Sequence, residues 1–585
     1  MKRWFKYIKP YLSSFILGPT GMIVEVIGEM FMPLLLAELI NRGNALTDGS
    51  TDVPPLDVPT SIGIAAILIG IVLLMMAGGV AGAYFGAKAS VNFAADLRRD
   101  LYAKVQRYSF ANIDKFSTSS LVTRMTNDVT QIQNFVNMLL RMALRSPGML
   151  IGGIIMAISI KPSLSVVLAV TMPIMLLVIG ALIMIGFPRF EKLQKKVDKL
   201  NSTVRENVTN VRVVKSFVRE DYEINKFYND NADLKKSGMD AVKILIWAGP
   251  VMNIFMYITV IAVIWSGHHI VLDGDMLVGD LSAFITYTTQ ILSSLMMVSM
   301  LFMFSSRALA SGKRICEVLD EEIDINDTNS LAESVAITNG DIEFRGVSFR
   351  YYKHSEEAVL DDINIHIPAG STVGIIGSTG CGKTTLVSMI PRLYDVDDGE
   401  VLIDGVNVKD YSLTSLRDGI GMVLQKNLLF SGSIEYNLRW GDENATDEEM
   451  IRASEHSASH KFVSTFKDGY NTLLDKGGMN LSGGQKQRLC IARALLKKPK
   501  ILILDDSTSA VDTATEKQIR DAFATDLQDC TKIIIAQRIS SVKDADTIIV
   551  MNDGRITGVG THDQLLGNNE EYSEIYYSQM DRKEA

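Results

Sequence analysis

The chain has 585 residues, which is too long for a single domain of ordinary size and indicates two or three domains. Acids outnumber bases, with 67 Asp and Glu against 58 Lys and Arg, so the formal net charge of -9 gives no reason to expect nucleic acid as a partner. The four cysteines, Cys316, Cys381, Cys490 and Cys530, lie far apart in the sequence. This spacing argues against disulfide bonds and against a zinc site, and it suits a reducing cytosol.

The N-terminal part of the chain, residues 1–319, contains long apolar segments of the kind that cross a membrane as helices. A spanning helix needs about 20 mostly apolar residues. The second span and the last three contain long runs without Asp, Glu, Lys or Arg, whereas the first carries acids and the third begins close to two arginines. We expect six spans, at about 11–40, 61–87, 135–160, 163–187, 244–272 and 279–306.

Basic residues predict the orientation of these spans. Four of them lie within the first nine positions, whereas the connection 41–60 has only Arg42 against three aspartates. Lys and Arg accumulate on the cytoplasmic side of a membrane, so we expect the N-terminus inside. An even number of spans then returns the C-terminal part of the chain to the cytosol.

The first ten residues combine the basic residues with Trp4, Phe5 and Tyr7. This composition predicts a short amphipathic helix that lies in the membrane interface. A cleavable signal peptide is the weaker alternative, because no small-residue cleavage site follows a short apolar core.

Two connections between spans, 88–134 and 189–243, are long, charged and poor in helix breakers. Loops of more than about 12 to 15 residues without structure are uncommon. We therefore expect the membrane helices to extend into the cytosol and to turn on short helices that contact another domain. The alternative is a pair of solvated linkers.

Two acids interrupt the first span. Glu25 and Glu29 are four residues apart and therefore lie on one face of a helix. An ionisable group within a span is costly and usually faces a protein interior or a watery cavity. One interpretation is that the pair attracts a cationic substrate. The other is that each carboxylate caps or hydrogen-bonds a neighbouring helix.

A different pattern follows the polar linker 320–340, and residues 341–585 read as a soluble α/β domain. A short apolar strand there ends in GSTGCGKT, and a helix-forming segment follows. This is the pattern of a phosphate loop, in which glycines let backbone N–H groups turn toward phosphates, Lys383 reaches the outer phosphates and Thr384 offers its hydroxyl to Mg²⁺. The expected nucleotide contacts of this loop are Gly377, Ser378, Thr379, Gly380, Cys381, Gly382, Lys383, Thr384 and Thr385.

Two further motifs complete a nucleotide site. The apolar segment ILIL ends in Asp505, whose carboxylate would hold Mg²⁺. Between this strand and the phosphate loop lies LSGGQ, which opens a helix-prone segment and offers an anion site at the start of that helix. The residues of this second site are Ser482, Gly483, Gly484 and Gln485. A second phosphate-binding surface on one chain suggests a site that is completed across a dimer.

With these motifs the whole chain resembles the ABC transporter superfamily, and specifically exporter half-transporters in which six spans are fused to one nucleotide-binding domain. The resemblance implies ATP and Mg²⁺ as cofactors, a dimer, and a place in a bacterial plasma membrane with the nucleotide domain in the cytosol. It implies that Tyr351 stacks on adenine, that Gln425 senses Mg²⁺ and the membrane domain, and that the loop Ser507 to Asp512 crosses the dimer interface. Residues 110–116 and 216–227 resemble the coupling regions of the family.

Three positions depart from the family pattern. Asp506 stands where the family has a glutamate that polarises the attacking water, and Gln537 stands where it has a histidine. The aspartate is shorter by one methylene, so its carboxylate retracts by about 1 Å, and a misplacement of that size can cost about a hundredfold in rate. Glutamine can hydrogen-bond the γ-phosphate but cannot share a proton or carry charge. Lys476 replaces an acid that is usual before LSGGQ.

We therefore expect ATP-driven export of amphipathic small molecules, drugs or lipids, by a heterodimer. In this dimer Lys383, Asp506 and Gln537 would form a degenerate, weakly hydrolytic site, while the intact LSGGQ would complete the competent site of the partner. Membrane lipids and the hydrophobic or amphipathic substrate are the other expected partners. The alternatives are a homodimer, a lipid or peptide exporter, and a non-hydrolytic regulatory subunit that binds ATP.

Overall fold

The computed structural model describes residues 2–48, 57–327, 335–351, 357–506 and 511–584. The chain divides into two compact units. The first contains residues 1–105 and 119–320, and the second contains residues 106–118 and 321–585. Helices followed by an α/β domain confirm the predicted fold class.

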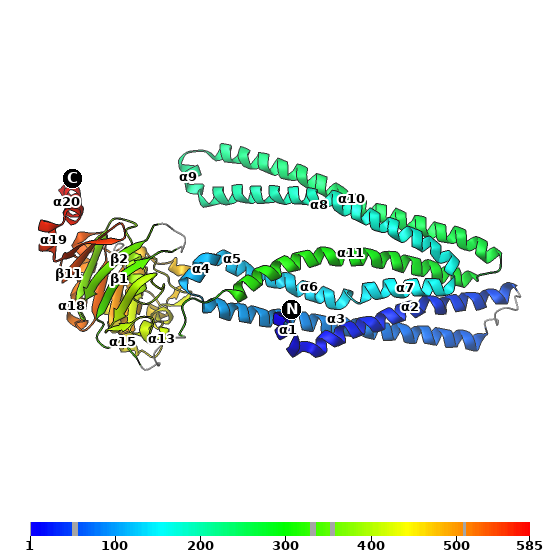
Figure 1. The fold of residues 1–585 in the computed structure, drawn as a ribbon, viewed down its shortest axis with the longest axis horizontal. Helices are drawn as coiled ribbons and strands as arrows, with labels where there is room; N and C mark the ends of the chain where they lie inside the picture. The colour runs from blue at the N-terminus through cyan, green and yellow to red at the C-terminus, as the bar shows by residue number, and fades with distance from the viewer. Residues whose placement is uncertain (1, 49–56, 328–334, 352–356, 507–510, 585) are drawn as a thin grey trace. The chain divides into compact units, whose positions relative to one another are not determined.

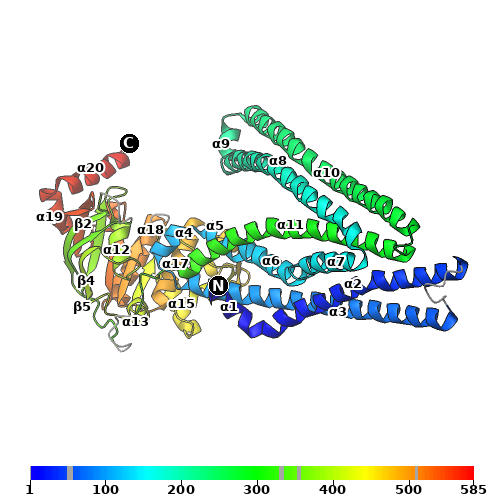
Figure 2. The same cartoon turned by 45° about the vertical axis from the view of Figure 1, so that its right-hand side comes forward.

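The first unit is built of long helices (Figures 1 and 2). Helix α3 has 49 residues, and at a rise of about 1.5 Å per residue it is roughly 70 Å long. This length is more than twice the thickness of the hydrocarbon core of a bilayer, about 30 Å. The helices of this unit are α1 Lys2–Ile8, α2 Leu12–Asp48, α3 Val58–Gln106, α5 Thr118–Thr123, α6 Val129–Met142, α7 Arg145–Ile160, α8 Pro162–Thr209, α9 Val211–Ser216, α10 Glu220–Leu272 and α11 Val278–Asp320.

Among the residues that the structure describes, five helical segments are long and apolar enough to cross a membrane. These segments are Val58–Gln106, Thr118–Ile160, Pro162–Thr209, Glu220–Leu272 and Val278–Val298. Helix α2, over the predicted first span, is not among them, although it packs against α7 and α11. The count of six spans therefore stays a prediction.

Two groups of helices make up the unit. Helices α8 and α10 run side by side and are joined through the short helix α9 (Figures 1 and 2). Helix α11 packs against α2, α6 and α7. Its buried residues Phe284, Tyr287 and Ile291 form a core with Val26 and Met30 of α2, and the Tyr287 hydroxyl donates to the backbone carbonyl of Met30.

The aromatic residues of the N-terminal helix pack on α3. The rings of Trp4 and Tyr7 lie 6.1 Å and 5.8 Å from the ring of Phe93. Lys6 Nζ donates to the Asp100 carboxylate at 2.6 Å, and the Tyr7 hydroxyl donates to the same group at 3.1 Å. Helix α1 is thus fixed to α3 by both apolar and charged contacts, while Phe5 remains exposed.

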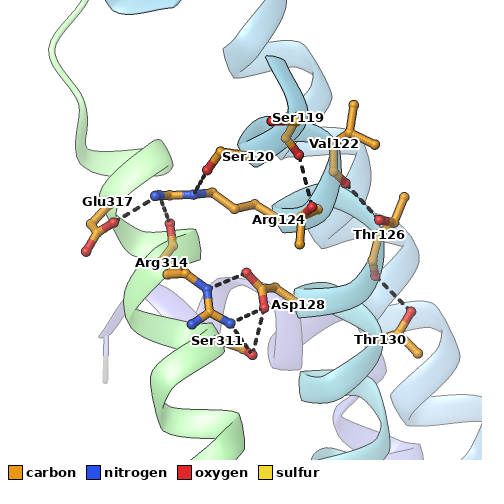
Figure 3. Close-up of polar contacts among 11 residues, drawn as sticks. Ser119, Ser120, Val122, Arg124, Thr126, Asp128, Thr130, Ser311, Arg314 and Glu317 are labelled. Atoms are coloured by element: carbon orange, nitrogen blue, oxygen red, sulfur yellow. Dashed lines mark hydrogen bonds and ion pairs between the residues drawn. The ribbon is translucent and has the colours of Figure 1, made fainter. Parts of the chain in front are cut away.

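A polar network joins the start of α6 to the C-terminal part of α11 (Figure 3). A single π-helical turn, Arg124–Asp128, precedes α6. The carboxylate of Asp128 is only 4% exposed; it accepts from Ser311 Oγ at 2.9 Å and from Arg314 Nε at 2.8 Å, and Arg314 Nη2 donates to its other oxygen. This paired geometry is that of a bidentate, charge-assisted contact.

A second arginine strengthens the same junction. Arg124 Nη1 donates to the backbone carbonyl of Arg314 at 2.7 Å and to the Glu317 carboxylate at 3.0 Å. Its Nε donates to Ser120 Oγ at 3.3 Å (Figure 3). The π-helical turn therefore holds α11 through its first and last residues, Arg124 and Asp128.

The second unit combines two sheets with short helices. The six-stranded sheet has the order β12-β11-β3-β10-β9-β6, and the four-stranded antiparallel sheet has the order β2-β1-β4-β5. The strands are β1 Ile342–Phe349, β2 Leu360–Ile367, β3 Thr372–Gly377, β4 Asp398–Ile403, β5 Val406–Asn407, β6 Ile420–Val423, β7 Gly432–Ser433, β8 Leu473–Leu474, β9 Ile501–Asp505, β10 Thr531–Ile535, β11 Thr547–Asn552 and β12 Arg555–Gly560.

The helices of this unit flank the sheets, and α4 comes from the connection between α3 and α5. They are α4 Phe110–Phe116, α12 Lys383–Met389, α13 Leu413–Asp418, α14 Ile434–Leu438, α15 Asp447–His456, α16 His460–Val463, α17 Gly483–Leu496, α18 Thr513–Asp526, α19 His562–Asn568 and α20 Glu570–Glu584. The predicted linker 320–340 begins where α11 ends, and its residues 328–334 lie outside the described residues.

Parallel pairing in the large sheet positions the site. Strands β9 and β10 are buried along their whole length, as is typical of parallel strands that are covered on both faces. Strand β10 pairs in parallel with β3 on one side and with β9 on the other, so Ile535 lies opposite both Ile375 and Asp505. The carboxyl ends of these strands therefore meet at one edge of the sheet, where α/β proteins bind ligands.

We expect Asp128→Asn to destabilise the protein, because the amide removes the charge that Arg314 pairs with while leaving an acceptor for Ser311. Loss of a hydrogen-bonded charge of this kind costs about 2 kcal/mol. The midpoint of thermal unfolding in detergent should fall. The control is Glu317→Gln, since that carboxylate is 45% exposed and its ion pair should contribute less than about 1 kcal/mol. Equal shifts in the two variants would contradict the prediction.

Candidate functional site

Four parallel strands end side by side at the candidate site. The order β3-β10-β9-β6 places the phosphate loop, Gln537, the acids Asp505 and Asp506, and Gln425 after neighbouring strand ends. Gln425 is exposed just beyond β6. The structure thus brings to one edge residues that are separated by more than 150 positions in the sequence.

The phosphate loop follows β3 and depends on glycine at two positions. Gly380 and Gly382 have φ angles of 89° and 95°, in the left-handed region that favours glycine. A Cβ atom on Gly382 would also lie 2.8 Å from the backbone oxygen of Val359. Lys383 Nζ donates to the carbonyl oxygens of Gly377 and Ser378 at 2.9 Å and 2.7 Å, which holds the ammonium group along the loop.

Two of the three predicted Mg²⁺ ligands, Thr384 and Asp505, contact each other, while the third, Gln425, is exposed and its role stays a prediction. Thr384 Oγ1 lies 3.0 Å from both carboxylate oxygens of Asp505. Asp505 is only 2% exposed, and this burial raises the pKa of its carboxyl group above the ordinary value. A nearby cation would favour the charged form of such a group, and Mg²⁺ prefers oxygen ligands.

Mg²⁺ would need few ligands from this chain. Among the described residues, no three His, Cys, Asp or Glu side chains cluster closely enough to hold a metal ion. Mg²⁺ characteristically uses one or two protein oxygens and completes its shell with water and substrate phosphates. The hydroxyl of Thr384 and the carboxylate of Asp505 fit that mode of binding.

Two of the three residues that depart from the family pattern, Asp506 and Gln537, are hydrogen-bonded to each other. Gln537 Nε2 donates to Asp506 Oδ2 at 2.7 Å. The backbone of Asp506 has a φ of 48°, and its N–H donates to the Ile535 carbonyl at 3.0 Å, which ties the end of β9 to the end of β10. Gln487 Nε2 also donates to the Asp506 carbonyl at 3.3 Å. The Asp506 carboxylate is therefore held by a neutral amide.

The LSGGQ segment begins a helix through a reciprocal cap. Ser482 Oγ accepts from the Gln485 N–H at 3.3 Å, and Gln485 Oε1 accepts from the Ser482 N–H at 2.9 Å. Together they cap α17, which has 14 residues. Ser482 and Gly483 are exposed, so this helix end is accessible to a ligand or to a second chain.

Tyr351 lies beside the phosphate loop. Its side chain is 43% exposed and its hydroxyl lies 2.9 Å from Thr385 Oγ1. The exposed ring offers a face on which a base could stack.

The predicted interface loop is described only in part. Residues 507–510 lie outside the described residues, and Asp512 accepts from the Thr515 N–H at 3.0 Å at the start of α18. Lys476, the third departure, is exposed in a short turn before LSGGQ. A role of these residues in communication between subunits stays a prediction.

The structure adds Tyr394, which sequence reasoning missed, and a contact of this residue with Asp114 in the predicted coupling region 110–116. The ring of Tyr394 lies 5.2 Å from the ring of Tyr351, and its hydroxyl donates to the Asp114 carboxylate at 2.8 Å. Tyr394 and Asp114 are 280 positions apart, and neither belongs to a phosphate-binding motif. No local sequence signal connects them.

In the first unit, the acids of α2 share one arginine. Arg145 Nη2, at the start of α7, lies 2.7 Å from Glu29 Oε1 and 3.2 Å from Glu25 Oε1. The second carboxylate oxygen of Glu29 is buried without a hydrogen-bond partner. These contacts fit the interpretation that the acids bind a neighbouring helix, although two carboxylates with one guanidinium leave a formal excess of one negative charge.

Comparisons with known proteins cover both parts of the chain. Residues 15–295 match the family described as ABC transporter transmembrane region, and residues 360–509 match the family described as ABC transporter. The chain is 37% identical to the uncharacterized ABC transporter ATP-binding protein YfiB of Bacillus subtilis, over 100% of this chain and 99% of that protein. It is 31% identical to the putative multidrug export ATP-binding/permease protein YgaD of the same organism, over 98% of each.

The fold has a solved counterpart. The structure of a bacterial Atm1-family ABC exporter with ATP bound superposes with a TM-score of 0.75 at 24% identity, over 98% of both chains. The two family matches and the 37% identical relative identify the helical unit as the membrane domain of an ATP-driven transporter and the α/β unit as its cytosolic ATP-binding domain. The chain belongs to the ABC transporter family, with both domains fused in one polypeptide.

Proposed function

We propose that this chain is the degenerate-site subunit of a heterodimer that exports amphipathic small molecules from a bacterial cell. The observation that carries the proposal is the hydrogen bond from Gln537 Nε2 to Asp506 Oδ2. It joins the two side chains that replace the glutamate and the histidine of the family. The proposed site residues are those of the phosphate loop with Tyr351, Gln425, Asp505 and the LSGGQ segment.

The chemistry of this pair favours ATP retention over hydrolysis. A water that attacks the γ-phosphate must be oriented by an acceptor, and positioning is most of what a protein contributes to phosphoryl transfer. The Asp506 carboxylate is shorter than a glutamate and already accepts from the amide of Gln537. That amide carries no charge and cannot act as a general acid or base. Binding of Mg²⁺ and phosphate is unaffected, because Thr384, Lys383 and Asp505 are all present.

The intact cap of α17 supports the heterodimer. In this family each ATP lies between the phosphate loop of one chain and the LSGGQ segment of the other. A homodimer would therefore contain two weak sites. With a partner that carries the glutamate and the histidine, the exposed Ser482 of this chain would complete a competent site. This arrangement uses every motif that the chain retains.

The substrate class rests on two observations of different kinds. YgaD, one of the similar proteins, is described as a putative multidrug exporter. In this chain, the cluster of Glu25, Glu29 and Arg145 carries an excess negative charge within the membrane domain. Together they favour amphipathic molecules with a positive charge.

We expect ATP hydrolysis by the purified chain alone to be slow. Replacing Asp506 with Glu and Gln537 with His in one variant should raise the turnover by about a hundredfold, because both changes restore positioning at the reaction centre. Steady-state phosphate release measures the effect. Adding Lys383→Ala to that variant is the control and should return the rate to background. Fast turnover by the unmodified homodimer would refute the degenerate-site assignment.

Two variants of this chain distinguish the two ATP sites of the heterodimer, copurified from the native host. Ser482→Arg should abolish ATP hydrolysis, since the added bulk would block the competent site of the partner. Lys383→Ala should lower hydrolysis by less than about tenfold, because it affects only the degenerate site. The reverse order of the two effects would show that the hydrolytic site is built on this chain's phosphate loop. If neither variant alters hydrolysis or transport, the chain is not an active half of the pump.

We expect negative charge in the membrane domain to favour the export of cationic molecules. Glu25→Gln leaves Glu29 and Arg145 as a neutral pair. It should reduce the efflux of cationic dyes relative to uncharged dyes of similar size by about fivefold, because the dye loses one ion pair of about 1 kcal/mol. The matched control is Glu38→Gln on the same helix, where Glu38 pairs with Arg42 at 2.6 Å. An unchanged ratio of cationic to uncharged efflux would end the charge-selection idea.

A further inference from the structure

Helix α20 contacts the loop 536–538, which follows β10 and carries Gln537. One side chain of this helix, Gln579, bridges two backbone groups there. Its Nε2 donates to the Gln537 carbonyl at 2.9 Å, and its Oε1 accepts from the Ile539 N–H at 2.9 Å. The side chain of Gln537 in turn donates to Asp506 Oδ2. Gln579 therefore holds the backbone from which the Gln537 side chain projects toward Asp506.

The backbone at this point needs a partner from outside its own segment. Strand β10 ends at Ile535, and a short 3-10 helix, Ile539–Ser541, begins four residues later. The first N–H groups of a helix have no partner within it, and a buried backbone group without a partner is costly. Ile539 is buried, and no side chain caps the 3-10 helix from its N-cap residue Arg538. The amide of Gln579 supplies the missing partner.

The pattern of α20 places Gln579 on the face that packs against the domain. Tyr572 is fully buried in the core that also contains Ile539, and Ile575 and Tyr576 pack against the same core. Gln579 follows Tyr576 by three residues and Ile575 by four, so it lies on the same face of the helix. An amide thus continues an apolar face at the point where that face meets backbone groups of the loop.

Near its start, α20 is linked to the phosphate loop. The Glu571 carboxylate accepts from Asn552 Nδ2 at 2.8 Å and from the Thr557 hydroxyl. Asn552 Oδ1 also accepts from Ser378 Oγ, a residue of the phosphate loop, at 3.4 Å. One helix is therefore connected to the phosphate loop through Glu571 and to the loop of Gln537 through Gln579.

We propose that Gln579 is a positioning residue of the ATP site, which acts by holding the amide of Gln537 in place. The inference rests on the proposed function, in which Asp506 and Gln537 replace the reactive pair of the family. It adds α20 to the elements that build this site and assigns to Gln579 a role in the retention of ATP.

The γ-phosphate makes the position of Gln537 measurable. The Gln537 amide can hydrogen-bond this group, which ADP lacks. Loss of one hydrogen bond to a charged group weakens binding by about tenfold. A change that loosens only the loop of Gln537 should therefore weaken the binding of ATP and spare that of ADP, whereas general damage to the domain weakens the binding of both.

The test compares the two nucleotides on the purified chain. Gln579→Met keeps the length of the side chain and a good helix former, but it removes both hydrogen bonds. In the presence of Mg²⁺ it should raise the Kd for MANT-ATP by about tenfold and leave the Kd for MANT-ADP within twofold of that of the unmodified chain. The proposal is overturned if binding of MANT-ATP is not weakened more than that of MANT-ADP.

The matched control is Ser578→Ala on the same helix. The Ser578 hydroxyl donates to the Ile575 carbonyl within α20, so its loss should leave the binding of both nucleotides unchanged. A selective loss of MANT-ATP binding in this control, equal to that of Gln579→Met, would also overturn the proposal, because it would show that any change in α20 has this effect.

A double-mutant cycle tests whether Gln579 acts through Gln537. In a Gln537→Ala background no amide remains to be positioned. Gln579→Met should then change the ratio of the MANT-ATP and MANT-ADP dissociation constants by less than twofold, because the two residues act through one interaction. Full multiplication of the two single effects would show that Gln579 acts on another part of the site and would overturn the assignment.

Phosphate release by the unmodified chain tests the underlying function separately. Fast release would refute the degenerate site, while the two MANT nucleotides would still report whether Gln579 positions Gln537. Slow release together with equal weakening of both nucleotides in Gln579→Met would keep the degenerate site and overturn the role of Gln579. The two failures therefore give different results.

Discussion

Parallel pairing of β3, β10 and β9 is the constraint on which the nucleotide site depends. These strands are apolar and buried, so their backbone groups must be paired within the sheet, and the register is fixed by side chains packed on both faces. The pairing brings the phosphate loop, Gln537 and the two acids to the same edge. Any slip of β10 against β9 would separate Gln537 from Asp506 and the N–H of Asp506 from the Ile535 carbonyl.

The same domain has contacts that lead away from the phosphates. Tyr351 connects the phosphate-loop helix to Tyr394, and Tyr394 connects to α4 through Asp114. In the membrane domain, the buried Asp128 holds the start of α6 against α11. Both junctions use a carboxylate with a specific donor, which gives a fixed geometry where apolar packing alone would permit sliding.

Local patterns in the sequence predicted much of the molecule. Phosphate loops, buried strands ending in acids and long uncharged segments are determined by neighbouring residues, so Lys383, Thr384, Asp505 and LSGGQ could be assigned from short segments. The Arg145 partner of Glu25 and Glu29 and the Tyr394 partner of Tyr351 could not be predicted in this way. Each contact joins residues far apart in the chain, and no residue near either partner in the sequence reveals it.

Taken by itself, the sequence determined the classes of segment and the chemical identity of each motif, because helix length, strand burial and phosphate-loop geometry follow from local composition. It also showed that an aspartate and a glutamine replace a glutamate and a histidine. Only the tertiary structure showed that these two replacements are hydrogen-bonded to each other and that Tyr351 contacts a second tyrosine. The physical reason is that such contacts depend on strand order and packing, which arise from the folded chain as a whole.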